Sequence, residues 1–126
     1  MIQLSRIIFY VQDVERLSDF YRQAFAFPLM QHIPGEWAVL QAGACELALH
    51  RVGAPYRGMT GAPGEMSNTK IVFAIDRPIA EMRDALIALG VSMGEIKQYP
   101  GVTGPLCDGR DPEGNVFQLA ETTPNG

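Results

Sequence analysis

The chain has 126 residues, 47% of them hydrophobic and 19% charged, with a formal net charge of −4. This length suits a single domain, and the composition is that of an ordinary globular protein and excludes an intrinsically disordered chain. No lysine- or arginine-rich stretch occurs, so a nucleic-acid partner is excluded, because phosphate backbones are bound by basic surfaces.

Membrane insertion and export are also not expected. The sequence contains no run of 18 apolar residues, and its first segment reaches a charge at Arg6 without a small-residue cleavage site. Cys45 and Cys107 form no C-x-x-C motif, which speaks against a zinc knuckle or a redox pair. We therefore expect a cytoplasmic protein with free thiols and no membrane partner.

The first half of the chain predicts a strand, a helix and three further strands. Residues 6–11 (RIIFYV) are β-branched and aromatic, and apolar residues then recur at helical spacing from Val14, with Asp13 as the N-cap. Pro28 should end this helix. Extended runs follow at 29–33, 37–41 and 45–50, separated by turn residues.

The second half repeats this plan. A strand at 70–75 leads to a helix that begins with Pro78, is capped by Asp76 and ends near Gly90, and strands should follow at 92–98, 103–107 and 116–120. An offset of 64 residues places Phe9 on Phe73, and an offset of 65 places Leu17 on Met82. We therefore predict one domain over 1–126, made of two modules (4–51 and 68–121) joined by a Gly- and Pro-rich linker, 52–67, that can serve as a lid.

Two motifs carry a family resemblance. Residues 11–27 (VQDVERLSDFYRQAFAF) and 111–119 (DPEGNVFQL) resemble the first helix and the last turn and strand of the vicinal oxygen chelate superfamily, which includes glyoxalases, bleomycin-resistance proteins and extradiol dioxygenases. The resemblance spans about residues 4–121. It implies an α+β fold in which two βαβββ modules form a cupped eight-stranded mixed sheet, often within a homodimer, so we expect a homodimer.

The family's metal-ligand positions are altered in this chain. The resemblance places these positions in the first and last strands of each module, where this sequence has Arg6, Ala48, Lys70 and Gln118. Guanidinium and ammonium groups only donate hydrogen bonds, alanine has no ligand atom, and an amide oxygen is a weak ligand. We therefore expect no metal and no other cofactor. A divalent metal stays open as an alternative, because a shift of the fourth strand by two residues would bring in Glu46 or His50.

Strand alternation predicts the lining of the cup, since every second residue of a strand points to the same face. Arg6 and Lys70 should hold an anionic or neutral small molecule, Gln118 should supply an amide contact, and Glu46 or His50 are candidates for proton transfer. The alternative is that Glu46 pairs with one of the cations and the cup is filled. The predicted ligand-binding residues are Arg6, Tyr10, Glu46, His50, Lys70 and Gln118.

Other conspicuous residues receive structural interpretations. Trp37 and Tyr99 are either aromatics that stack against a planar ligand or core and interface aromatics, and we favour the latter. We expect Cys107 to be a small buried hydrophobe before an Asp108-Gly109 turn, and the 111–115 turn to have no chemistry.

Three functions remain. A metal-independent small-molecule-binding protein is favoured over a lyase or dioxygenase with a non-standard metal site, and over a non-catalytic structural or regulatory domain.

Overall fold

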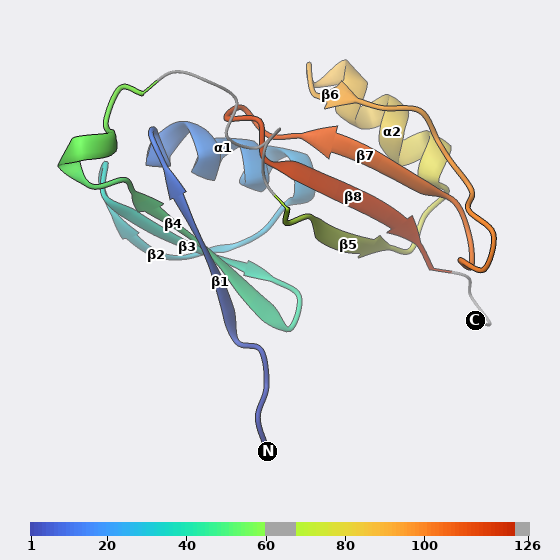
Figure 1. Ribbon diagram of the computed structural model, residues 1–126, viewed down its shortest axis with the longest axis horizontal. Coiled ribbons are helices and arrows are strands. Elements are labelled where there is room, and N and C mark those ends of the chain that lie inside the picture. Colours follow the sequence, from blue (N-terminus) through green and yellow to red (C-terminus); the bar gives the residue numbers. More distant parts are fainter. Residues whose placement is uncertain (60–67, 123–126) are drawn as a thin grey trace. The chain divides into compact units, whose positions relative to one another are not determined.

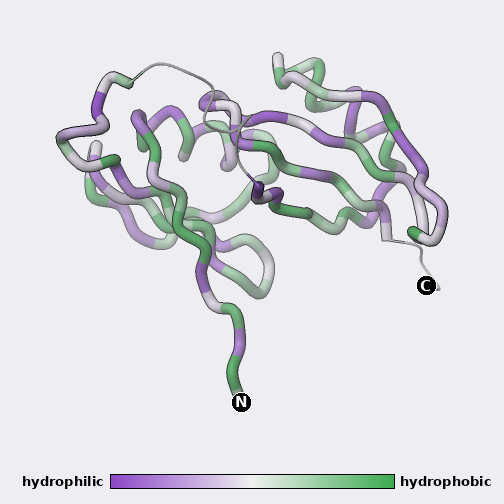
Figure 2. Tube along the Cα trace, in the orientation of Figure 1, coloured by the Kyte–Doolittle hydropathy of each residue, from purple (hydrophilic) through white to green (hydrophobic). Residues whose placement is uncertain are grey.

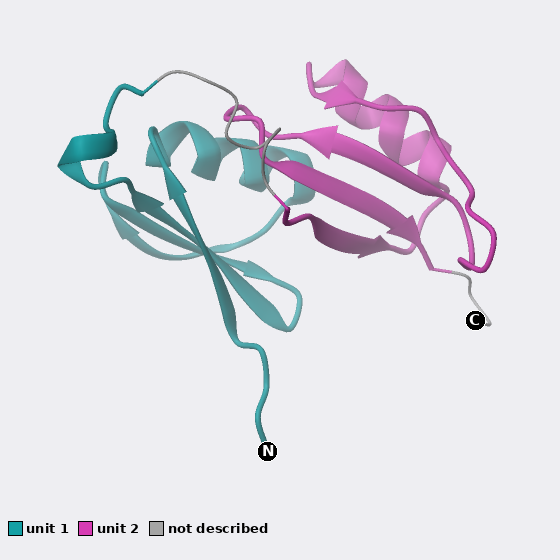
Figure 3. Ribbon diagram, in the orientation of Figure 1, with its two compact units in different colours: residues 1–61 teal, residues 62–126 magenta. Residues whose placement is uncertain are grey.

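The computed structural model describes residues 1–59 and 68–122. The chain forms two compact units, Met1–Gly61 and Ala62–Gly126, and each contains one four-stranded mixed sheet and one α-helix (Figures 1 and 3). The predicted repeat of one βαβββ unit is therefore confirmed. The joining of both sheets into one cup stays a prediction.

The first unit contains β1 (Arg6–Val11), α1 (Val14–Phe25), β2 (Leu29–Ile33), β3 (Trp37–Ala42) and β4 (Cys45–Arg51), followed by a short 3₁₀ helix, η1 (Ala54–Tyr56). The strand order in its sheet is β1-β4-β3-β2. β1 runs parallel to β4, and the other neighbours are antiparallel. The helix between β1 and β2 therefore lets the chain pass from one edge of the sheet to the other.

The second unit has the same topology. It contains β5 (Ile71–Ile75), α2 (Ile79–Ala88), β6 (Ser92–Met93), β7 (Leu106–Arg110) and β8 (Val116–Glu121), in the sheet order β5-β8-β7-β6. β5 is again parallel to the last strand of its unit. Figure 2 shows that β1 and β5 both run mainly through hydrophobic residues, as their sequences predict.

Each helix packs on its own sheet through equivalent residues. α1 begins where the Asp13 carboxylate accepts a hydrogen bond from the Arg16 N–H at 3.0 Å, which confirms the predicted N-cap. The buried apolar residues of α1 recur in α2 at an offset of 65, which confirms the predicted helix alignment. They are Val14, Leu17 and Tyr21 in α1, and Ile79, Met82 and Leu86 in α2.

The helix ends correct two details of the prediction. Asp76 does not cap α2: Pro78 occupies the N-cap position, and no side chain bonds to the free N–H groups there. α1 ends at Phe25, before Pro28, because Ala26 adopts a left-handed conformation with φ 58° and its N–H bonds to the Arg22 carbonyl.

Two strands of the second unit also differ from the prediction. β6 covers only Ser92–Met93, because Met93 pairs with Gly109 while Lys97 pairs with Leu106, so the intervening segment has one residue more than β7 and breaks the ladder. β7 begins after Pro105, which has no N–H for the ladder, and continues through Arg110. Asp108 and Gly109 are therefore strand residues, and the turn lies at 111–115.

The start of the predicted linker is fixed to the end of β1. The Gln12 side chain donates to the Tyr56 carbonyl at 2.7 Å and accepts from the Gly58 N–H at 2.8 Å. The predicted lid concerns residues 60–67, which lie outside the described residues.

Two predictions from composition can be compared with the structure. Cys45 and Cys107 are free cysteines, as expected. Within residues 1–59 and 68–122, no helix has the length and hydropathy that a membrane span requires.

The 111–115 turn depends on one buried carboxylate, so its removal should destabilise the second unit. Asp111 is 5% exposed and accepts hydrogen bonds from the Glu113 N–H and from the backbone and side chain of Asn115. Asp111→Ala should lower the free energy of unfolding by about 2–3 kcal/mol, because it leaves these donors unsatisfied. Urea denaturation measures this. The matched control is Asp84→Ala on the exposed face of α2, which should change stability by less than about 0.5 kcal/mol; equal effects of the two substitutions would contradict the assignment.

Candidate functional site

The face of each sheet that points away from its helix carries the predicted site residues. In the first unit, the parallel pairing of β1 and β4 sets Arg6 opposite Glu46, Ile8 opposite Ala48, and Tyr10 opposite His50. The register that the sequence left open is thereby fixed. Ala48 is fully buried and occupies the position counted for it, so neither Glu46 nor His50 replaces it.

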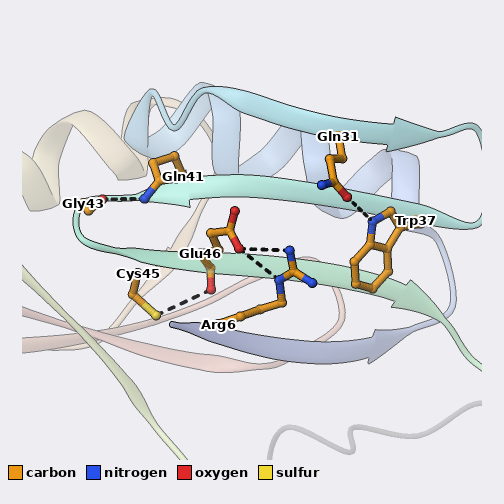
Figure 4. A network of polar contacts seen from close by, with 7 residues as sticks. All are labelled: Arg6, Gln31, Trp37, Gln41, Gly43, Cys45 and Glu46. Carbon is orange, nitrogen blue, oxygen red and sulfur yellow. Dashed lines mark hydrogen bonds and ion pairs between the residues drawn. The ribbon is translucent and has the colours of Figure 1, made fainter. Parts of the chain in front are cut away.

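Arg6 is held by two neighbours on this face. Its Nε and Nη2 atoms lie 3.1 and 2.9 Å from the same carboxylate oxygen, Oε1 of Glu46, and its Cζ atom lies 5.4 Å from the centroid of the Trp37 ring (Figure 4). A guanidinium over an indole face gains a cation–π attraction in addition to the ion pair. Glu46 therefore pairs with a cation, Arg6, as the alternative interpretation requires, whereas its second part, a filled cup, stays a prediction.

Three aromatic side chains continue this face. His50 lies 5.2 Å from Tyr10 and 5.7 Å from Trp37 between ring centroids. Trp37 also donates its indole N–H to the Gln31 side chain at 3.2 Å (Figure 4). The indole thus contacts Arg6 and His50 on the face where the ligand was expected, and the core or interface role expected for Trp37 stays a prediction.

His50 has a defined tautomer when it is neutral. Its Nδ1 atom lies 2.6 Å from the Arg51 carbonyl oxygen, which can only accept a hydrogen bond, so Nδ1 carries the proton. The Nε2 atom then has a lone pair, which is the arrangement that a proton acceptor needs. Neither a hydrogen bond nor an ion pair joins Nε2 to any part of the chain that the structure describes.

The second unit has a different set of polar side chains at the equivalent positions of its own sheet. Lys70 precedes β5, and its Nζ atom lies 2.8 Å from Oδ2 of Asp108 on β7; Gln118 on β8 donates to the other oxygen, Oδ1, at 3.0 Å. Burial would raise the pKa of the Asp108 carboxyl, but hydrogen bonds from Lys70 and Gln118 and the positive charges of Lys70 and Lys97 outweigh it and lower the pKa. Asp108 is therefore an ionised acceptor at neutral pH.

This polar group forms part of a depression of about 440 Å³ on the helix-free face of the second sheet. Three cationic and two acidic side chains line it, which leaves one positive charge in excess. Tyr99, 48% exposed, also lines it and is thus not a core residue, whereas its role at an interface or against a planar ligand stays a prediction. The charged and polar side chains around the depression are Lys70, Glu95, Lys97, Tyr99, Asp108, Arg110 and Gln118.

The strand pairing within each sheet shows which residues of the two modules are equivalent. Ile8, Ala48 and Val39 are neighbours across the first sheet, as Val72, Gln118 and Asp108 are across the second. Gln118 is therefore the counterpart of Ala48, as counted from the sequence. Asp108 was missed because Asp-Gly was interpreted as a turn, although period-two alternation with buried Cys107 and Gly109 places it on the open face.

The residues at the metal-ligand positions that the resemblance implies do not fit a divalent ion. Arg6 and Lys70 are cations already paired with carboxylates, Ala48 has no ligand atom, and the Gln118 amide, whose N–H bonds to Asp108, offers only a weak, uncharged oxygen. Within residues 1–59 and 68–122, no three His, Cys, Asp or Glu side chains lie close enough together to hold a metal.

Two residues with reactive or titratable side chains, His32 and Cys107, lie outside these two groups. His32 pairs with Glu15 of α1 at 2.8 Å, on the helix side of the sheet. Cys107 is buried, and this burial raises the pKa of its thiol, so it stays protonated and behaves as a small core residue, as expected.

The predicted site residues thus fall into two groups. The structure brings together Arg6, Tyr10, Glu46 and His50 in the first unit, and Lys70 and Gln118 in the second.

Comparison with known proteins shows the fold. No family model matches the chain, and no curated protein matches it. Among solved structures, the chain is similar to a lactoylglutathione lyase from Agrobacterium tumefaciens (TM-score 0.75, 21% identity, covering 94% of this chain and 92% of that one). It is also similar to TnmS3, an antibiotic-binding protein from Streptomyces sp. CB03234 (0.75, 22%, 98% and 98%), and to the fosfomycin resistance protein FosX from Listeria monocytogenes (0.75, 18%, 99% and 97%).

The electrostatics of Asp108 predict an acid-dependent effect. Its folded-state pKa lies below the ordinary 3.8, so the ion pair contributes stability above the unfolded-state pKa, and this stability is lost as the pH falls through the folded-state pKa. A carboxyl-carbon NMR titration should give a pKa below 3.8 for Asp108, and a higher pKa in Lys70→Met, where burial is opposed by fewer charges. An unchanged Asp108 pKa in Lys70→Met would refute this description.

Proposed function

We propose that this chain, which has the vicinal oxygen chelate fold, is a small-molecule-binding protein whose ligand lies in the depression of the second module and binds without a metal. The observation that carries the proposal is the Lys70–Asp108–Gln118 group, which lines a depression of about 440 Å³. A concave site with a few convergent polar groups is the usual form of a small-molecule site. One of the similar structures, TnmS3, is an antibiotic-binding protein, which agrees with this class.

The polar atoms suggest the ligand's chemistry. Lys70 uses one N–H toward Asp108 and keeps two more, and Gln118 donates its amide N–H and keeps its carbonyl oxygen as an acceptor. The excess of one positive charge around the depression favours a carboxylate or another group with acceptor oxygens. Because Asp108 compensates Lys70, the ligand is held by hydrogen bonds more than by net charge.

Binding without turnover is favoured over lyase or oxygenase chemistry by the side chains at the metal positions. Two paired cations and an alanine replace groups that would have to donate electron pairs to an ion. A divalent ion beside Arg6 or Lys70 would also be repelled by a like charge.

A thermal-shift screen followed by calorimetry tests the proposal. Purified protein, its metal content determined by elemental analysis, is mixed with succinate, lactate or methylphosphonate, and separately with Mn²⁺, Ni²⁺, Zn²⁺ or Fe²⁺. A ligand that binds only the native state raises the melting temperature, by an amount that follows its concentration relative to Kd. We expect metal-free protein to be stabilised by at least one of these anions.

Two variants make the test specific to the depression. Lys70→Met should weaken anion binding about tenfold, the loss of one charge-assisted hydrogen bond. Arg16→Met removes a positive charge from the exposed face of α1 and should have no effect. Metal bound at a stoichiometric level would overturn metal independence. So would a rise in melting temperature with a divalent ion that is still seen in Lys70→Met.

We also propose that the protein works as a cytoplasmic homodimer. β1 is an edge strand; Ile2 and Leu4, which precede it, are 101% and 71% exposed, and Tyr10 within it is 68% exposed. An open edge flanked by apolar side chains favours association with another chain. Light scattering after size exclusion should give twice the 13.8 kDa chain mass, and Leu4→Asp together with Tyr10→Asp should shift it toward the monomer; a monomer at micromolar concentration would disprove the dimer.

A further inference from the structure

A second depression, of about 450 Å³, lies where α1 ends and the chain turns into β2, and we call it the α1 depression. One wall is polar and comes from the last turns of the helix. The other wall is mainly apolar and comes from the turn that follows the helix. The lining includes Asp19, Arg22 and Gln23 of α1, and Ala26, Phe27 and Pro28 of the turn.

The apolar wall is supported by a stack of aromatic rings. Tyr21, which is 1% exposed, stacks on Phe25 with 6.1 Å between ring centroids, and Phe25 stacks on Phe27 with 5.5 Å. The next residue is also fixed, because the Pro28 carbonyl accepts a hydrogen bond from the Gln41 N–H at 2.9 Å. The half-buried Phe27 ring is therefore held in place before any ligand arrives, which lowers the entropic cost of binding against it.

Ala26 adds a strained residue to this wall. Its φ is 58°, and among residues 1–59 and 68–122 it is the one non-glycine residue with a positive φ. Glycine is usual at this position after a helix, because a Cβ atom is strained in the left-handed conformation. Backbone strain of this kind is concentrated at ligand-binding positions. The methyl group of Ala26 also gives the depression an apolar contact that a glycine would not provide.

The polar wall carries two opposite charges that are not paired with each other. Asp19 and Arg22 are exposed and lie three positions apart in α1, a spacing at which side chains are neighbours on one helix face. Neither the Asp19 carboxylate nor the Arg22 guanidinium has a hydrogen bond or an ion pair within the part of the chain that the structure describes. Both groups are therefore available to a ligand.

From these two walls we infer that the α1 depression binds a zwitterionic α-amino acid with an aromatic or large apolar side chain. The ammonium group of the ligand pairs with Asp19, its carboxylate pairs with Arg22, and its side chain packs against Phe27. The charges of Asp19 and Arg22 sum to zero, which matches a ligand without net charge. The C-terminal end of α1 also carries the negative end of the helix dipole, which favours a ligand with an ammonium group over a simple anion.

This site goes beyond the binding proposed for the second module and uses none of the residues around Lys70. A carboxylate-bearing probe could also enter that other depression, so the test requires a signal that is resolved by residue. The backbone amides of Ala26, Phe27 and Leu29 in ¹⁵N-labelled protein provide such a signal, since they belong to the turn that lines the α1 depression or directly follow it.

Three matched probes test the ligand class by NMR titration. L-Phenylalanine carries both charges, 3-phenylpropionate lacks the ammonium group, and 2-phenylethylamine lacks the carboxylate. We expect L-phenylalanine to shift these three amides saturably. Each of the other two probes should bind there about three- to fivefold more weakly, the effect of losing one solvent-exposed ion pair.

Variants on the exposed face of α1 assign each charge. Asp19→Asn should bind L-phenylalanine and 3-phenylpropionate equally, because the partner of the ammonium group is lost. Arg22→Gln should bind L-phenylalanine and 2-phenylethylamine equally, because the partner of the carboxylate is lost. The matched control is Arg16→Gln, on the exposed face of the first turn of α1, which should retain both preferences.

The amide spectrum of each variant verifies that it is folded before the titration. The inference is overturned if L-phenylalanine causes no saturable shift at these three amides. It is also overturned if the preference for the zwitterion over 3-phenylpropionate survives in Asp19→Asn, or if Arg16→Gln loses the preferences as the other two variants do.

Discussion

Each helix of this protein buries one face of one four-stranded sheet, and the placement of every functional side chain depends on that packing. Tyr21 of α1 and Leu86 of α2 are almost fully buried at equivalent positions. Since a strand sends successive side chains to opposite faces, packing under the helix commits the alternate residues to the other face. One face of each sheet is thus available for ligand recognition without disturbing the core.

A cation on the open face requires an acidic partner, and the two modules supply that carboxylate from different strands. Arg6 meets Glu46 directly across the β1–β4 pair. Val116 occupies the corresponding position in the second module, so Lys70 reaches Asp108, one strand farther across the sheet, where Gln118 supports the same carboxylate. As a result, the open face of the first sheet carries aromatic side chains around an ion pair. The open face of the second sheet carries polar side chains around a depression. Duplicated modules have in this way acquired distinct chemistry on one architecture.

The fold could be predicted to a large extent because its signals are local. The period-two and helical patterns identified all the longer strands and both helices, and Asp13 was a correct cap because an Asx side chain bonds to a nearby N–H. The errors arose where two local signals competed. Asp108-Gly109 has turn composition, yet strand pairing with Phe117 and Gln118 prevails over it. Asp76 resembles a cap, yet Pro78 takes the N-cap position.

The sequence by itself determined the repeat, the residues at the metal-ligand positions that the resemblance implies, and the presence of Arg6, Tyr10, Glu46 and His50 on the first face. Those features follow from periodicity and from motif spacing, which are properties of the chain order. Tertiary structure alone decided the pairing: which carboxylate neutralises Arg6 and which neutralises Lys70, that Trp37 supports a guanidinium, and that His50 keeps Nε2 for another donor. Such contacts join residues far apart in sequence and depend on strand register, and a shift of one residue would turn every side chain to the opposite face.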